Sequence, residues 1–195
     1  MKINKSLPVL VTGATGYIAG WVVKNLLDEG ITVHAPIRDT DNTQKREHLD
    51  KLAENSSGKI KYFESDLMIE DSYKEAMKGC ELVIHTASPF VMDSKDPQKE
   101  VIEPALKGTQ NVLKTVNETE SVKRVVLTSS IAAIYGNSID GQSVEGGLFN
   151  ESMWNTTSTS TDGEYSYSKT VAEKEAWKIC EEQKRWDLVV INPGF

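Results

Sequence analysis

Tyr165 and Lys169 stand four residues apart in a segment, 164–184, whose sequence predicts a helix, and this spacing puts them on one helix face. A lysine ammonium beside a phenol favours the phenolate and lowers the tyrosine pKa from its usual value of about 10. Tyr165 could then act as a general acid or base near neutral pH. Ser130 follows the apolar run at 123–128 and could hold a substrate carbonyl toward Tyr165. The structural alternative is an exposed Tyr–Lys pair, which is common on helices; Tyr167 has Val171, not lysine, four residues on.

A glycine-rich turn near the N-terminus could hold a phosphate group. The apolar run 9–11 predicts a buried strand, Gly13 and Gly16 follow it, and a helix is expected over 16–29, ending at Gly30. In the order strand, turn, helix, such glycines let the backbone approach a pyrophosphate, and the helix amides face it. An ordinary strand-to-helix turn is the alternative.

Helices and strands must alternate along the chain to position these residues. Apolar runs predict six strands, at 9–11, 31–37, 59–64, 81–85, 123–128 and 188–191. Helices are expected over 44–54, 71–78 and from 96 or 97 to 118, with Pro104 marking a kink or the true start of the last. Pro36 suggests that the second strand lies at a sheet edge or ends there. This alternation predicts an α/β fold with a doubly wound parallel sheet of Rossmann type and at least six strands.

Polar residues follow several of these strands, where doubly wound sheets bind their ligands. Arg38 ends the second strand and suits the 2′-phosphate of NADP, whereas the adjacent Asp39 would suit the ribose of NAD. We expect NADP, and NAD less. Asp66 could meet an adenine amino group or simply cap a helix, and Asn111 could bridge a water to Lys169 or lie exposed on its helix. The other clusters at strand ends are Thr12-Gly13, Thr86-Ala87-Ser88 and Thr128-Ser129-Ser130.

Composition excludes several classes of function. A net charge of −7 argues against a general nucleic-acid-binding protein. No segment approaches the roughly 20 apolar residues of a membrane span, and the N-terminus lacks a long apolar signal segment, so we expect a cytoplasmic protein without a membrane partner. Cys80 and Cys180 lack redox or metal spacing, and the three histidines, at 34, 48 and 85, have no ligand partners at suitable spacing. We therefore predict no metal and expect structural or surface roles for the histidines.

Residues 137–163 are rich in Ser, Thr, Gly and Asn and show no clear periodicity. Long segments of this kind are substrate loops or lids, or else are disordered. We expect a substrate-side loop here. The helices expected over 97–118 and 164–184 could also pack against a second copy, which leaves a homodimer open.

Taken together, the motifs resemble the extended short-chain dehydrogenases/reductases. They are T-G-A-T-G-Y-I-A at 12–19, D-L at 66–67, H-T-A-S-P at 85–89, T-S-S at 128–130, Y-S-Y-S-K at 165–169 and N-P-G at 192–194. Residues 94–113, A-P-I-R-D at 35–39 and N-E-S-M-W at 150–154 are similar to the branch of dihydroflavonol, cinnamoyl-CoA and yeast-type methylglyoxal (aldehyde) reductases. The resemblance covers essentially the whole chain.

This resemblance implies NADPH-dependent reduction of a small-molecule carbonyl substrate. Ser130 matches the substrate-orienting serine, Tyr165 the proton donor, and Lys169 the residue that binds the nicotinamide ribose and lowers the tyrosine pKa. Arg38 and Lys45 match the pair that holds the 2′-phosphate. The cofactor-binding positions that it implies are Gly13, Thr15, Gly16, Tyr17, Ile18, Arg38, Lys45, Asp66, Leu67, Thr86, Ala87, Ser88, Thr128, Tyr165, Lys169 and Pro193.

Two departures from the family pattern bear on this expectation. Ala19 stands where plant members have a third glycine. Family chains also continue well past the P-G motif, so residues 1–195 resemble the dinucleotide-binding domain of a longer reductase whose C-terminal substrate lobe is largely absent. Two other functions stay open: an NAD-dependent sugar-nucleotide epimerase or dehydratase, and a dinucleotide-binding module without catalysis.

Overall fold

Six parallel strands form a single sheet in the order β3-β2-β1-β4-β5-β6. The computed structural model describes residues 3–88 and 94–194, so Pro89 of the H-T-A-S-P motif lies outside the described residues. The order reverses direction between β1 and β4, which is the switch point of a doubly wound sheet. The predicted fold class is confirmed. The strands are β1 Val9–Thr12, β2 Thr32–Ile37, β3 Lys59–Glu64, β4 Leu82–His85, β5 Arg124–Thr128 and β6 Asp187–Ile191.

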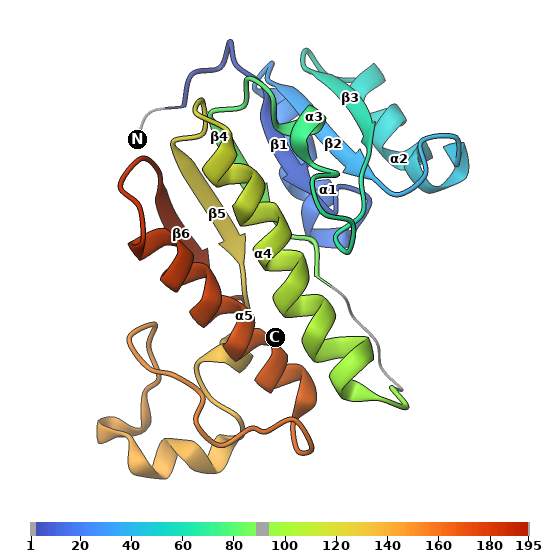
Figure 1. The fold of residues 1–195 in the computed structure, drawn as a ribbon. Coiled ribbons are helices and arrows are strands. Elements are labelled where there is room, and N and C mark those ends of the chain that lie inside the picture. Colours follow the sequence, from blue (N-terminus) through green and yellow to red (C-terminus); the bar gives the residue numbers. More distant parts are fainter. Residues whose placement is uncertain (1–2, 89–93, 195) are drawn as a thin grey trace.

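Helices cover both faces of the sheet, with α4 and α5 on one face and α1 and α2 on the other (Figure 1). Alternate strand residues serve the two faces: Leu10 and Val83 pack toward α4, while Val9 and Val11 pack toward α1. The helices are α1 Tyr17–Asp28, α2 Thr43–Glu54, α3 Lys74–Met77, α4 Glu103–Glu118 and α5 Glu164–Glu181. A π-helix, η1, spans Gln98–Ile102, and short 3₁₀ helices span Ile131–Ala133 (η2), Ser138–Ser143 (η3) and Glu145–Gly147 (η4).

Two prolines lie near the ends of secondary-structure elements, where the missing N–H is tolerated. Pro36 lies in β2, which is an interior strand, so the expectation of an edge was wrong and that of a strand terminus was right. The missing N–H is tolerated because the β1–β2 pairing ends at Leu10 and His34, and Pro36 is paired only with Phe63 of β3. Pro104 stands in the first turn of α4 and marks its start after η1, where a missing N–H is not needed.

Residues 131–163 lie beyond the carboxyl ends of β5 and β6, in orange in Figure 1. Two side chains organise this segment. Asp140 Oδ2 accepts hydrogen bonds from the amides of Gly136 and Asn137 and from Thr157 Oγ1. Asn155, which is buried, donates to the Ala132 carbonyl at 2.9 Å and accepts from backbone amides of its own turn. The segment therefore folds back on the end of β5.

Candidate active site

The glycine turn after β1 needs a glycine at its first position. Gly13 has φ +66°, and a Cβ there would lie 2.9 Å from the Cα of Ala87. Gly16 closes the turn, donating its N–H to the Gly13 carbonyl at 2.8 Å, and begins α1 without a side-chain cap. The residues at the tip are exposed, among them Thr15, Gly16, Tyr17 and Ile18. Backbone amides at a helix N-terminus are thus open to a ligand.

The ends of β1 and β4 are joined through Thr12, which the sequence placed in a polar cluster at a strand end without indicating this contact. Its Oγ1 lies 2.7 Å from His85 Nδ1 and accepts the Ala87 N–H at 3.1 Å, while Thr86 donates its hydroxyl to the Thr12 carbonyl. His85 is fully buried, and this burial lowers its pKa to about 4. It is buried and neutral at physiological pH and bonds the end of β1, which agrees with the structural role expected for it. His34 is also structural, with Nδ1 on the Ala76 carbonyl at 2.6 Å.

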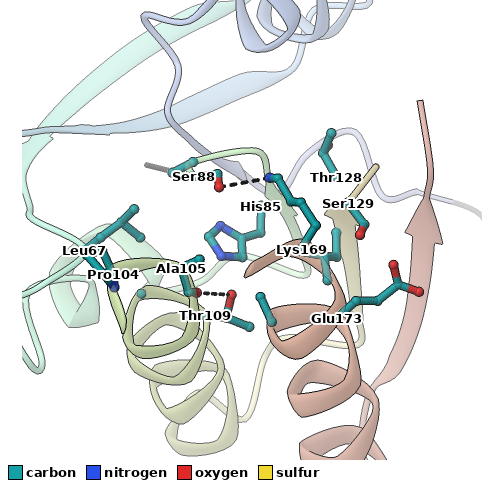
Figure 2. Close-up of a pocket in the computed structure, with 14 residues that line it drawn as sticks. Leu67, His85, Ser88, Pro104, Ala105, Thr109, Thr128, Ser129, Lys169 and Glu173 are labelled. Atoms are coloured by element: carbon teal, nitrogen blue, oxygen red, sulfur yellow. Dashed lines mark hydrogen bonds between the residues drawn. The ribbon is translucent and has the colours of Figure 1, made fainter. Parts of the chain in front are cut away.

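Lys169 extends from α5 toward the end of β4, where Nζ donates to Ser88 Oγ at 2.9 Å (Figure 2). The side chain is only 8% exposed, and burial lowers its pKa to about 8. The Lys169 side chain borders a cavity of about 20 Å³, which is large enough for one water molecule. Leu67, Ala87, Thr128, Ser129 and Glu173 are among its other lining residues. The buried Ser129 hydroxyl has no hydrogen-bond partner within the described residues.

Tyr165 and Ser130 are brought together as predicted. Ser130 Oγ accepts the Ala132 N–H at 3.1 Å, which leaves its own hydrogen for Tyr165. Burial raises the pKa of Tyr165, and the hydrogen bond from Ser130 lowers it. The expected lowering by Lys169 is not found, because Nζ is turned to Ser88 and lies 5.6 Å from the centre of the tyrosine ring. Tyr165 is 38% exposed, so its hydroxyl is within reach of a substrate.

Arg38 and Lys45 lie apart from this group, after β2 and in the first turn of α2. Both are exposed, and within the described ranges neither forms an ion pair. Asp39 is the residue whose carboxylate would suit the ribose of NAD. Its Oδ1 accepts the backbone N–H groups of Asp41 and Asn42, at 3.0 and 3.2 Å. Its carboxylate therefore shapes the turn before α2.

The turn after β3 is built by Asp66 and Asn111. Asp66 Oδ1 accepts the Met68 N–H at 2.8 Å, so it closes a local turn and caps no helix. Asn111 donates to the Leu67 carbonyl at 2.7 Å. It is half-buried, so the expectation of an exposed asparagine was wrong; a water bridge to Lys169 stays a prediction. Pro193 accepts the Ile131 N–H at 3.1 Å and so lies beside the Ser130 loop.

The described part of the chain holds no group of three or more His, Cys, Asp or Glu residues suited to a metal ion. Cys80 and Cys180 are free thiols. No helix among residues 3–88 and 94–194 is long and apolar enough to cross a membrane.

The geometry fits a dinucleotide along the carboxyl ends of the strands. The backbone space beside Gly13 is one that a Cβ would fill, the residues that open α1 are exposed, and two exposed cations, Arg38 and Lys45, follow β2 and begin α2. These features suit a pyrophosphate and a further phosphate group, respectively. Ala87, Ser88 and Thr128 line the small cavity beside Lys169, and Thr86 is bonded to Thr12, the residue before Gly13.

Comparison with known proteins assigns the family. The model of the NAD dependent epimerase/dehydratase family matches residues 9–194. The chain belongs to this family. It is similar to the cinnamoyl-CoA reductase CAD2 of Medicago truncatula, with 44% identity over 190 residues, 96% of this chain and 57% of the relative. It is also 39% identical to an anthocyanidin reductase of Arabidopsis thaliana, over 95% of this chain and 54% of that protein.

A solved structure is similar to this chain in fold and sequence. Gre2 of Candida albicans in complex with NADPH superposes with a TM-score of 0.82 and 31% identity, over 97% of this chain and 58% of Gre2. The chain thus spans little more than half the length of the curated relatives and the structure that it matches. The predicted resemblance to reductases of this family is confirmed.

Proposed function

We propose that the protein reduces the carbonyl group of an aldehyde or ketone to an alcohol with NADPH. The observation that carries the proposal is the meeting of Ser130, Tyr165 and buried Lys169 at the carboxyl ends of β4 and β5. The names of its relatives support it, since these are cinnamoyl-CoA and anthocyanidin reductases and an NADPH-bound Gre2.

Each of the three side chains has a distinct task in this reaction. Bound NADPH supplies the hydride. Tyr165 donates its phenolic proton to the carbonyl oxygen, and Ser130, already bonded to Tyr165, holds that oxygen in place. Lys169 is the nearby cation that stabilises the phenolate left on Tyr165, provided that its Nζ moves from Ser88 toward the ring. Such hydrogen bonds often tighten only when the reacting complex is assembled.

The dinucleotide would be held through two of its phosphate-bearing groups. Residues 15–18 are exposed, and their backbone amides, apart from that of Gly16, would face the pyrophosphate, while Arg38 and Lys45 would take the 2′-phosphate. Asp39 Oδ1 already accepts two backbone N–H groups of its own turn, which supports NADP over NAD in this proposal. Residues 137–163 contribute to the substrate side, and residues 1–195 form the dinucleotide-binding domain. A homodimer and a cytoplasmic location stay predictions from the sequence.

The test is NADPH oxidation by the full-length protein with a panel of aldehydes and ketones. Tyr165→Phe should lower kcat by about 100-fold or more, the range for loss of a general acid. Tyr167→Phe is the matched control, two residues along the same helix, and should change kcat less than about threefold. Equal rates in the parent and Tyr165→Phe would refute the proposal. Retention of dinucleotide without net NADPH consumption would favour an epimerase or dehydratase.

A further inference from the structure

Glu173 is a buried carboxylate in the turn of α5 that follows Lys169. It is 6% exposed, and within the described residues it has no ion-pair partner. Burying an ionised carboxylate costs several kcal/mol unless hydrogen bonds compensate. Both of its oxygens accept such bonds, Oε2 from Asn192 Nδ2 at 2.9 Å and Oε1 from Trp177 Nε1 at 3.3 Å. In Figure 2 its carboxylate points away from the Lys169 ammonium, to the side where β6 lies.

Asn192 connects this carboxylate to the serine loop. The same Nδ2 that donates to Glu173 donates its second hydrogen to the Ser130 carbonyl, at 3.1 Å. The backbone on either side follows β6, since Ser129 N–H donates to the Ile191 carbonyl at 2.8 Å and Ile131 N–H to that of Pro193 at 3.1 Å. Residues 129–131 are therefore hydrogen-bonded to residues 191–193 at three points.

We propose that Glu173 is a positioning residue that fixes Ser130 relative to Tyr165 through Asn192. Tyr165 and Lys169 are carried by α5, whereas Ser130 is carried by the loop after β5, so two separate elements must stay in register. Glu173 belongs to α5 and accepts a hydrogen bond from Asn192, just after β6. The serine loop is hydrogen-bonded to the backbone on either side of Asn192. The proposal rests on the proposed carbonyl reduction for its kinetic consequence, and its structural consequence can be measured independently.

Two substitutions of similar volume separate the hydrogen bond from packing. Glu173→Met keeps the aliphatic stem and removes the acceptor, whereas Glu173→Gln keeps an oxygen that can accept from Asn192. In the full-length protein Glu173→Met should lower kcat about 10- to 100-fold, the scale of a misplacement near 1 Å. Glu173→Gln should recover most of this loss. The Kd for NADPH should change less than about threefold, because no dinucleotide-binding residue is touched.

A double-variant cycle tests the path through Asn192. Asn192→Ala alone should resemble Glu173→Met, and the two together should be no worse than the more severe single variant. In a Tyr165→Phe background Glu173→Met should have no further effect on residual turnover. Glu175→Met is the matched control: Glu175 lies on the same helix but accepts from Gln110 of α4 at 2.8 Å, and it should leave kcat unchanged.

Amide hydrogen exchange supplies the readout that does not need turnover. Exchange across 129–133 should speed up in Glu173→Met and Asn192→Ala and stay unchanged in Glu175→Met. Inactivity of the parent protein would refute the reductase, and exchange would still decide whether the link exists. Unchanged exchange in Glu173→Met, or additive kcat losses in the cycle, would overturn the positioning role.

Discussion

Replacing Gly13 by alanine perturbs the glycine turn at its tightest point. Two costs are expected at this position. The backbone sits at φ +66°, which disfavours any residue with a Cβ by about 1 to 2 kcal/mol. The added Cβ would also lie 2.9 Å from the Cα and 3.0 Å from the N of Ala87, and the backbone of Ala87 is held by its hydrogen bond to Thr12. Forcing such a contact apart costs about 1 to 3 kcal/mol.

Two other glycines separate these costs. Gly79 has φ +74° but open space where its Cβ would lie, so Gly79→Ala should cost about 1 to 2 kcal/mol. Gly20 lies inside α1 with no heavy atom within 4 Å of an added Cβ, so Gly20→Ala should stabilise the protein by about 0.5 to 1 kcal/mol. Gly13→Ala, which bears both costs, should destabilise by about 2 to 5 kcal/mol.

Urea unfolding of the full-length protein measures the series, with the m-value checked for constancy. Binding of NADPH should weaken in Gly13→Ala and remain at the parental level in Gly79→Ala, because only the first change displaces the turn that faces the pyrophosphate. If Gly13→Ala is no more destabilising than Gly79→Ala, the close approach to Ala87 is not real, and the reasoning fails.

Two further predictions concern charge. Burial lowers the pKa of Lys169 from 10.5 to about 8, so the unfolded chain binds more protons between these pH values. The free energy of unfolding of the parent relative to Lys169→Met should therefore rise from pH 8 to 10.5, by on the order of 3 kcal/mol; a pH-independent difference would contradict this. Arg38→Ala should weaken NADPH binding about 10- to 100-fold, the value of a charge-assisted hydrogen bond, and leave NADH binding nearly unchanged. Calorimetry measures both affinities, and Lys51→Ala, in the last turn of the nearby helix α2, is the control. An equal loss for NADH would refute the role of Arg38.

The sheet and its helices could be predicted from the sequence because buried parallel strands appear in it as continuous apolar runs. Short polar turns separate these runs from the helices. Val101 in η1 and Ala105, Val112 and Val116 in α4 stand at helical spacing in the sequence, and all four are buried. Pro104 was correctly suspected of marking a helix start. A one-dimensional pattern could not show the π-helix before it, which depends on local backbone packing.

Hydrogen bonds between distant polar residues were the part that could not be predicted. Asn155 and Asp140 organise residues 131–163, yet in the sequence they look like any loop Asn and Asp. Asn111 reaches the Leu67 carbonyl, 44 positions away. The pKa of Tyr165 depends on burial that the Y-x-x-x-K spacing does not contain. Such features follow from the three-dimensional arrangement of the strand ends.

The glycine turn and the lysine of the candidate site are mechanically connected. Gly13 packs on Ala87, and the next residue, Ser88, accepts the hydrogen bond of Lys169. Thr12 holds the Ala87 amide from one strand while His85 anchors Thr12 from the next. A ligand that moved the glycine turn would thus also move the hydroxyl that now holds the ammonium. Gly13, Ala87, Ser88 and Lys169 therefore form one continuous series of contacts.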